Sequence, residues 1–123
     1  MAAPVFGLIG ISHRTAEVAV RERMALDGEA QVRLQEALRA AGIAESVVLS
    51  TCNRTEIYGV GRPGMDAEGT EAALVEALCQ DRGVPVETLR DHLYRMRGVD
   101  AVRHLFRVAA ALDPDVAAAC DLH

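Results

Sequence analysis

Aromatic residues are scarce in this chain, which has two tyrosines, two phenylalanines and no tryptophan among its 123 residues. Half of the residues are nevertheless hydrophobic. Alanine, valine and leucine must therefore supply most of the core, and the length suits one domain over residues 1–123. The net charge of -5 argues against a protein that coats nucleic acid in general.

Cysteine is also rare, and Cys52, Cys79 and Cys120 show no CxxC or cysteine–histidine ligand spacing. Neither a disulfide framework nor a zinc site is predicted, and reduced thiols fit the pattern better. The first residues lack the basic segment of a secretion signal, and no apolar run approaches the ~18 residues of a membrane span. We therefore expect a cytoplasmic protein with no membrane segment.

The signatures of nucleotide cofactors are missing as well. The segment GLIG at residues 7–10 does not have the G-x-G-x-x-G spacing of dinucleotide-binding proteins, and the sequence contains no P-loop. No pair of carboxylates and no cluster of metal ligands stands out. We therefore predict neither a cofactor site nor a metal site within this chain.

Apolar periodicity and turn residues predict alternating strands and helices. Strands are expected over residues 5–11, 46–50 and 56–60, with a further edge strand over 89–96. Helices are expected over residues 16–25, 27–41, 67–82 and 99–112. This order predicts an α+β fold of the ferredoxin-like type, an α/β sandwich in which a mainly antiparallel sheet carries helices on one face, plus a C-terminal helix.

The helix boundaries rest on a few residues. Thr15 and Asp27 are candidate N-caps of the first two helices. Gly42 and Gly83 are expected to end the second and third helices. Val32 is expected on the apolar face of the second helix.

The segment LSTCNRTEIY at residues 49–58 is the most informative in the chain. Its cysteine, Cys52, lies among polar neighbours, and a nearby cation lowers a thiol pKa and so favours the reactive thiolate. Arg54 offers a planar fork that matches a carboxylate. Two plainer interpretations remain open: Cys52 as a small buried hydrophobe, and Arg54 in a structural ion pair with Glu56 or Glu45.

Polar residues also follow the first predicted strand, in the segment SHRT at residues 12–15. The end of one strand can share a pocket with the loop of another, so His13 could transfer a proton and Thr15 could donate a hydrogen bond. An exposed turn with a helix cap is the alternative. Five arginines between residues 90 and 107 could contact phosphates, although a solvated face is the simpler interpretation.

Three segments, in the same order, resemble motifs of the glutamyl-tRNA reductase family. GISHRTA at residues 10–16, followed by VRER at 20–23, is similar to the N-terminal motif. VVLSTCNRTEIY at residues 47–58 is similar to the catalytic motif, and AVRHLFRVA at 101–109 to a third. The resemblance covers nearly the whole chain and would make it the N-terminal catalytic domain of such an enzyme.

The resemblance implies a route to glutamate-1-semialdehyde, the first committed step of tetrapyrrole (5-aminolevulinate) biosynthesis. Cys52 would attack the ester carbonyl of glutamyl-tRNA, release the tRNA and form a thioester that NADPH would reduce. His104 would assist catalysis. The residues implied at the glutamate site are Thr51, Asn53 and Arg54, bordered by Ser12, His13 and Thr15.

The family also implies partners. It binds NADPH and forms homodimers through domains that we expect to lie outside these 123 residues, so the hydride step is not expected of this chain alone. Glutamyl-tRNA is the implied substrate, and another enzyme of the tetrapyrrole pathway is a further candidate partner.

Some residues depart from the family pattern. Pro114 stands where a substrate-contacting serine is expected, Ala118 and Ala119 replace a Gly-Glu pair, and Glu17 replaces a proline. Two alternatives therefore stay open. One is a degenerate reductase-like module that binds or regulates without turnover, and the other is a thiol-dependent esterase that releases glutamate from glutamyl-tRNA.

Overall fold

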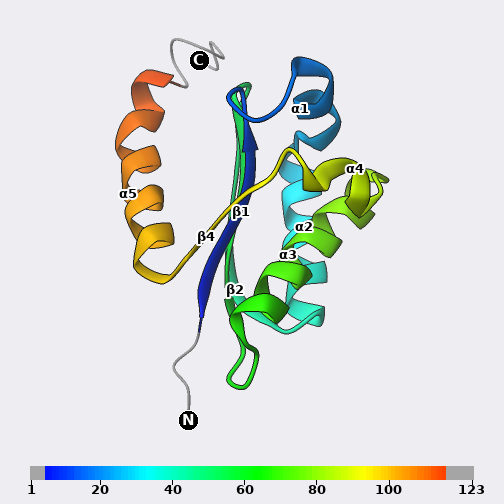
Figure 1. Ribbon diagram of the computed structural model, residues 1–123, viewed down its shortest axis with the longest axis vertical. Helices are drawn as coiled ribbons and strands as arrows, with labels where there is room; N and C mark the ends of the chain where they lie inside the picture. Colours follow the sequence, from blue (N-terminus) through cyan, green and yellow to red (C-terminus); the bar gives the residue numbers. More distant parts are fainter. Residues whose placement is uncertain (1–4, 116–123) are drawn as a thin grey trace.

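A four-stranded sheet separates two helical layers in the computed structural model, which describes residues 5–115 (Figure 1). The strand order is β2-β3-β1-β4, and every neighbouring pair is antiparallel. The strands are β1 (Phe6–Ser12), β2 (Ile43–Ser50), β3 (Arg54–Gly61) and β4 (Tyr94–Arg97).

Helices cover both faces of this sheet (Figure 1). On one face lie α1 (Val18–Met24), α2 (Gly28–Ala40), α3 (Ala67–Arg82) and α4 (Val86–Arg90). The last helix, α5 (Gly98–Asp115), lies on the opposite face. The connectivity and strand order are those of a ferredoxin-like α+β sandwich with an added C-terminal helix, which confirms the predicted fold class.

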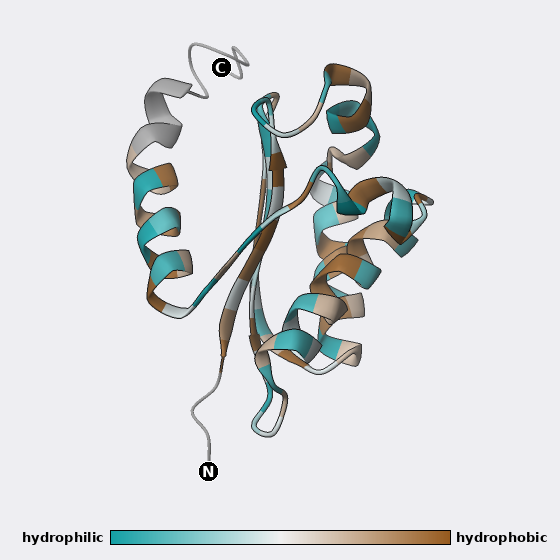
Figure 2. Cartoon of the chain, viewed as in Figure 1, coloured by the Kyte–Doolittle hydropathy of each residue, from teal (hydrophilic) through white to brown (hydrophobic). Residues whose placement is uncertain are grey.

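The larger core fills the space between the sheet and the layer of α1 to α4 (Figure 2). Ile9 and Ile11 of β1 alternate toward this layer, as period-2 burial requires. Helix spacing brings Leu34 and Leu38 of α2 onto the same face, and both are fully buried. The other large side chains in this core include Met24, Ile57, Leu74, Leu78 and Leu89.

Helix ends follow the expected chemistry at most positions. The carboxylate of Asp27 accepts a hydrogen bond from the Ala30 N–H at 2.8 Å, which confirms the predicted N-cap of α2. Gly83 ends α3 in the left-handed conformation, with φ of 67°. Thr15 does not cap α1, because Glu17 occupies that position without a side-chain cap.

Two further sequence-based assignments are wrong. Residues 89–96 do not form one strand, because α4 extends to Arg90 and β4 begins at Tyr94. Pro85 is the N-cap of this short helix, and Leu89 is its buried residue. The apolar residues Leu89 and Leu93 flank polar positions in the sequence and so imitated strand alternation. Val32 is 56% exposed, because it lies two residues from the buried Ala30 and Leu34 and therefore on the other side of α2.

A smaller apolar cluster lies between the sheet and α5, formed by Leu8, Tyr58 and Ala101. The ring of Tyr94 lies over the backbone of Gly10, where an added Cβ would be 2.8 Å from the tyrosine Cζ. Only glycine allows this close approach. Among residues 5–115, no helix combines the length and apolar character needed to cross a bilayer.

We predict that Gly10→Ala destabilises the fold and displaces Tyr94. The new methyl group would overlap a ring whose hydroxyl is hydrogen-bonded, and such overpacking costs about 1–3 kcal/mol in the free energy of unfolding. Urea unfolding measures the loss. Gly28→Ala is the control, since nothing lies within 4 Å of a Cβ there; an equal loss in both variants would contradict the close-approach argument.

Candidate functional site

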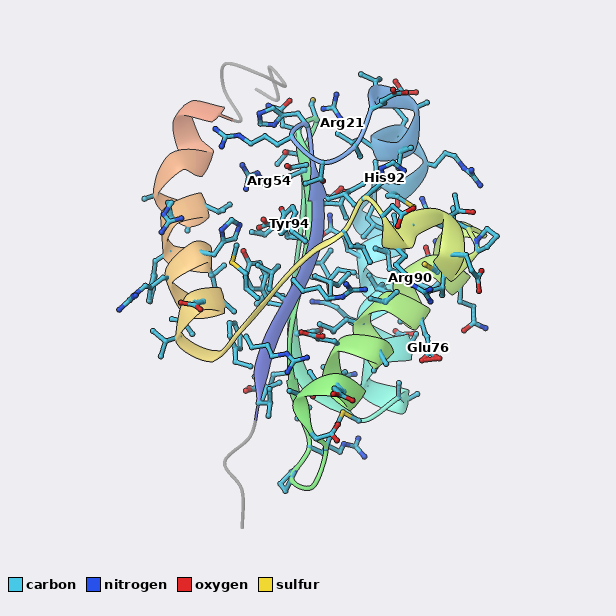
Figure 3. The ribbon with its side chains drawn as sticks, viewed as in Figure 1. Arg21, Arg54, Glu76, Arg90, His92 and Tyr94 are labelled. Atoms are coloured by element: carbon cyan, nitrogen blue, oxygen red, sulfur yellow. The ribbon has the colours of Figure 1, made fainter. Side chains whose placement is uncertain are left out.

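A cavity of about 510 Å³ lies between the end of β1, strands β3 and β4, and helix α5. The sheet register builds it, because Ser12 of β1 pairs with Arg54 of β3, while Gly10 pairs with Tyr94 of β4. Figure 3 shows Arg54 and Tyr94 between the sheet and α5. Residues that line the cavity include Ser12, His13, Thr15, Arg54, Tyr94 and His104.

A buried carboxylate, that of Glu56, lies beneath this cavity and is fully excluded from solvent. It accepts hydrogen bonds from the Tyr58 hydroxyl at 2.6 Å, the His104 Nε2 at 2.6 Å and the Tyr94 hydroxyl. An Arg54 guanidinium nitrogen lies 3.3 Å away. A buried charge is tolerated only when it is paired and hydrogen-bonded, and these four donors meet that condition.

The same environment changes the acidity of the two tyrosines. Burial, followed by the hydrogen bond to Glu56 and its negative charge, raises the pKa of Tyr58 far above its ordinary value. The same causes raise the pKa of Tyr94, and Arg54 opposes them only in part. Both hydroxyls therefore stay protonated and act as fixed donors to Glu56.

His104 has its ring orientation fixed by this carboxylate. Because Glu56 can only accept, the Nε2 of His104 carries the proton in their hydrogen bond. In the neutral ring Nδ1 is then an acceptor, and this buried atom has no hydrogen-bond partner among the described residues. His104 therefore lines the cavity with one ring nitrogen bound to Glu56 and the other without a partner among the described residues.

Cys52 lies in the three-residue loop that joins β2 to β3, and it is exposed. The Asn53 N–H donates to the Thr51 hydroxyl at 3.2 Å, and the Asn53 carbonyl accepts from the His13 N–H at 2.9 Å. The Arg21 guanidinium donates to the Cys52 carbonyl at 3.2 Å. Hydrogen bonds from the turn after β1 and from helix α1 therefore hold the cysteine loop in position.

The structure brings five of the proposed site residues to one cavity. Ser12, His13, Thr15, Arg54 and His104 all line it. The hydroxyl of Thr15 accepts from the Ser12 N–H at 3.0 Å, and the Ser12 hydroxyl accepts from the Arg14 N–H at 3.2 Å, so both hydroxyls also shape the turn.

The other three, Thr51, Cys52 and Asn53, lie on the adjoining loop and are not among the residues that line the cavity. In this structure Cys52 is disulfide-bonded, contrary to the expectation of reduced thiols, so thiolate chemistry there requires reduction.

Several residues that depart from the family pattern lie outside the described part of the structure. Pro114 falls within α5, but its side chain is outside the described part of the structure. Ala118, Ala119 and Cys120 also lie outside the described residues.

Sequence reasoning missed Tyr94 and Arg21, and treated Glu56 only as an ion-pair partner. Arg54 forms the ion pair with Glu56 that the structural interpretation predicted, and it also lines the cavity. Alternation along β3 was the available signal, because Arg54, Glu56 and Tyr58 must share one face of the sheet. Nothing in the sequence around Tyr94 indicated that its hydroxyl reaches the same carboxylate.

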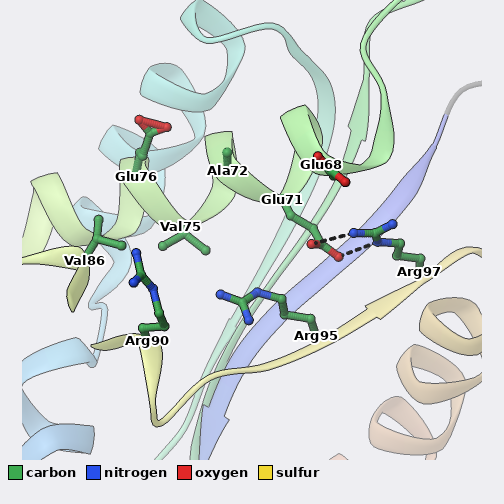
Figure 4. A pocket seen from close by; sticks show the side chains of 9 residues that line it. All are labelled: Glu68, Glu71, Ala72, Val75, Glu76, Val86, Arg90, Arg95 and Arg97. Atoms are coloured by element: carbon green, nitrogen blue, oxygen red, sulfur yellow. Dashed lines mark hydrogen bonds and ion pairs between the residues drawn. The ribbon is translucent and has the colours of Figure 1, made fainter. Parts of the chain in front are cut away.

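A separate hollow of about 660 Å³ lies on the other face, between α3, α4 and β4 (Figure 4). It receives three of the arginines from the cluster between residues 90 and 107. Arg97 forms a bidentate ion pair with Glu71, at 2.8 and 3.1 Å. Neither cysteine nor histidine lines this hollow, and the described residues contain no cluster of metal ligands.

The fold and the site together define a ferredoxin-like domain that presents a cysteine hairpin beside an arginine- and histidine-lined cavity. Residues 9–118 match the family model described as "Glutamyl-tRNAGlu reductase, N-terminal domain". The chain therefore belongs to the glutamyl-tRNA reductase family, as its N-terminal domain.

Individual relatives agree with this membership. The chain is 51% identical to a glutamyl-tRNA reductase of Thermus thermophilus over 92% of its own length, and 44% identical to one of Geobacter sulfurreducens over 86%. A solved glutamyl-tRNA reductase from Methanopyrus kandleri matches 88% of the chain with 30% identity and a TM-score of 0.57. The chain spans 24% of the length of these two curated relatives.

The tyrosine network generates a spectroscopic prediction. The chain has only two tyrosines and no tryptophan, so tyrosinate absorbance reports Tyr58 and Tyr94 alone. Because both pKa values are raised in the folded state, we expect no tyrosinate signal near pH 10 until the protein unfolds. The contribution to stability is complete below the unfolded pKa of about 10 and is lost as pH rises above it.

Titration in denaturant supplies the reference curve for this experiment. Glu56→Gln removes the charge, so both tyrosine pKa values should fall, and circular dichroism checks that the variant is folded. Tyr94→Phe isolates the signal of Tyr58. Ordinary titration of both tyrosines in the folded wild-type protein would contradict the buried network.

Proposed function

We propose that this domain forms a glutamyl thioester from glutamyl-tRNA. The Cys52 thiolate attacks the ester carbonyl, a sulfur–carbon bond forms, and the bond to the terminal ribose oxygen breaks as that oxygen gains a proton. The observation that carries the proposal is the exposed Cys52 loop, held by hydrogen bonds from His13 and Arg21 beside the cavity that Arg54 and His104 line.

Arg54 is proposed to hold the substrate carboxylate. In glutamyl-tRNA the α-carboxyl is esterified, so the γ-carboxylate is the free anion that the cavity must recognise. Arg54 contacts Glu56 through a single nitrogen at 3.3 Å, and its side chain is 21% exposed. Part of its planar fork therefore stays available for a second carboxylate.

His104 is proposed to handle the proton. Its Nε2 is committed to Glu56, and its Nδ1 has no partner among the described residues. This nitrogen is suited to accept a proton as the thiolate forms and to return it to the leaving hydroxyl. Tyr58 and Tyr94 support this role indirectly, because they help to hold the Glu56 carboxylate that orients the ring.

The complete reaction of the family lies beyond this domain. We propose that hydride from NADPH, held outside these residues, reduces the thioester to glutamate-1-semialdehyde for tetrapyrrole biosynthesis in the cytoplasm. The chain lacks a dinucleotide-binding fingerprint, so we derive no step through the cofactor from it. In its absence, water would slowly hydrolyse the thioester and give free glutamate.

Intact-protein mass spectrometry tests the proposal. With reduced protein and glutamyl-tRNA, we expect a covalent glutamyl adduct that maps to Cys52, together with release of tRNA. Cys52→Ser should abolish the adduct, because a serine hydroxyl is far less ionised than a thiol. Cys79→Ala is the control and should form it normally, since burial raises the pKa of the Cys79 thiol and leaves it 3% exposed.

Other outcomes of this assay separate the alternatives. Binding of glutamyl-tRNA without adduct or free glutamate would favour a degenerate binding module. Free glutamate in place of a trapped adduct would favour the esterase. Semialdehyde formed by this chain alone with NADPH would contradict the placement of the hydride step outside it.

Arg54→Lys tests the carboxylate clamp. A lysine keeps the charge but loses the fork, and loss of a charge-assisted hydrogen bond costs about 1.5–3 kcal/mol. We expect capture of a small glutamyl ester to weaken about ten-fold or more, and the preference over the glutaminyl ester to shrink. Arg95→Lys, in the hollow on the other face, is the matched control. Unfolding of Arg54→Lys would instead assign Arg54 a purely structural role through Glu56.

A further inference from the structure

A further hollow, of about 700 Å³, lies beside α1 and adjoins the cysteine loop. We call it the α1 groove; its lining includes Arg14, Glu17, Val20, Arg21 and His92. The turn at residues 13–15 lines both the α1 groove and the 510 Å³ cavity beside Arg54 and His104, which we call the glutamate cavity because it is the proposed site of the glutamyl group. That turn is therefore a wall shared by the two hollows, and the cysteine loop is hydrogen-bonded to it through His13.

Arg21 connects the α1 groove directly to the cysteine. One of its terminal nitrogens donates to the Cys52 carbonyl at 3.2 Å. Its Nε is buried and has no hydrogen-bond partner among the described residues. The described part of the chain also places no carboxylate within ion-pair distance of this guanidinium. Arg21 is thus a cation beside the reaction centre with unused donors.

The charges in the α1 groove favour an anion. Arg14 and Arg21 face a single acidic lining residue, Glu17. His92 adds a ring whose Nδ1 donates to the Thr15 carbonyl at 3.1 Å. Figure 3 shows Arg21 and His92 on the α1 side of the sheet and Arg54 on the α5 side. This local positive charge stands out in a chain with a net charge of -5.

The shape of the substrate requires a second binding surface. If the glutamyl group fills the cavity and its carbonyl meets Cys52, the ribose and its phosphodiesters must extend away past the loop. We propose that the α1 groove binds the phosphodiester backbone of the single-stranded acceptor end of the tRNA, with Arg21 and Arg14 as phosphate contacts. Guanidinium groups suit this task because they donate bidentate, charge-assisted hydrogen bonds to phosphate oxygens.

This inference rests on the proposed function, and the arginines of the hollow between α3, α4 and β4 compete with it. That hollow holds Arg90 and Arg95, but Arg97 is committed to Glu71, and Glu68 and Glu76 also line it (Figure 4). It shares no lining residue with the glutamate cavity. A substrate that extends from the glutamate cavity past Cys52 would therefore enter the α1 groove, but it would not reach the hollow between α3, α4 and β4.

Fluorescence anisotropy with a short labelled single-stranded RNA ending in CCA tests the proposal at several salt concentrations. Wild-type protein should bind it in a salt-dependent manner. Arg21→Gln should weaken binding several-fold and reduce the slope of log K against log salt by about 0.7, the value for one lost phosphate contact on a single strand. Arg23→Gln is the matched control, because Arg23 lies on the same helix, is exposed and lines neither hollow.

Arg14→Gln provides a second variant, because its exposed side chain lines the groove without holding the cysteine loop. It should also weaken RNA binding. Absence of salt-dependent binding by the wild-type protein, or an equal loss in Arg23→Gln, would overturn the proposal. So would wild-type binding by Arg14→Gln together with an Arg21→Gln variant impaired on a small glutamyl ester, since Arg21 would then only position the loop.

The small ester also separates this inference from the proposed function. Glutamyl ethyl ester has no phosphate, so Arg14→Gln and Arg21→Gln should each lose a larger fraction of their activity on glutamyl-tRNA than on this ester. Failure of the wild-type protein to form any adduct, with RNA binding intact and sensitive to Arg21 and Arg14, would refute the thioester chemistry and leave the RNA groove standing.

Discussion

The packing of α5 against its face of the sheet depends on one constraint, the buried carboxylate of Glu56. Left without donors, a buried charge of this kind would cost several kcal/mol. Its partners come from three elements, since Arg54 and Tyr58 lie on β3, Tyr94 on β4 and His104 on α5. The apolar cluster on this face is small, so a polar network rather than a large core fixes how α5 lies against the sheet.

Local signals were enough to predict most of the fold. Asp27 and Gly83 mark helix ends through side-chain and backbone chemistry that a few neighbouring residues determine. The failure at residues 89–96 has a physical reason, because five residues of helix and four of strand are each too short to show a clear period. Val32 shows the same limit, since a single apolar residue does not reveal which face of a helix is covered.

The site was less accessible to sequence reasoning. The turn at residues 12–15 was expected to share a pocket with the cysteine loop, because a strand end can lie beside the loop of another strand. The register agrees, since it pairs Ser12 with Arg54. His104 entered only through family resemblance, since one histidine in a helix carries no signal of its own. Tyr94 depends on the register of β4 against β1, and Arg21 on the packing of α1 beside the cysteine loop. Such long-range geometry is set by the whole fold rather than by any local pattern.

The central position of β1 has a consequence for how the chain is made on the ribosome. Its segment FGLIGIS emerges before its partners β3 and β4, up to the pairing of Gly7 with Arg97. Nascent chains therefore carry an unpaired apolar strand until β3 and β4 have been synthesised, a stage at which exposed strand edges are prone to aggregate. Glu56 gains its histidine only when α5 follows, so within this domain the face of the sheet that α5 covers is completed after the face that α1 to α4 cover.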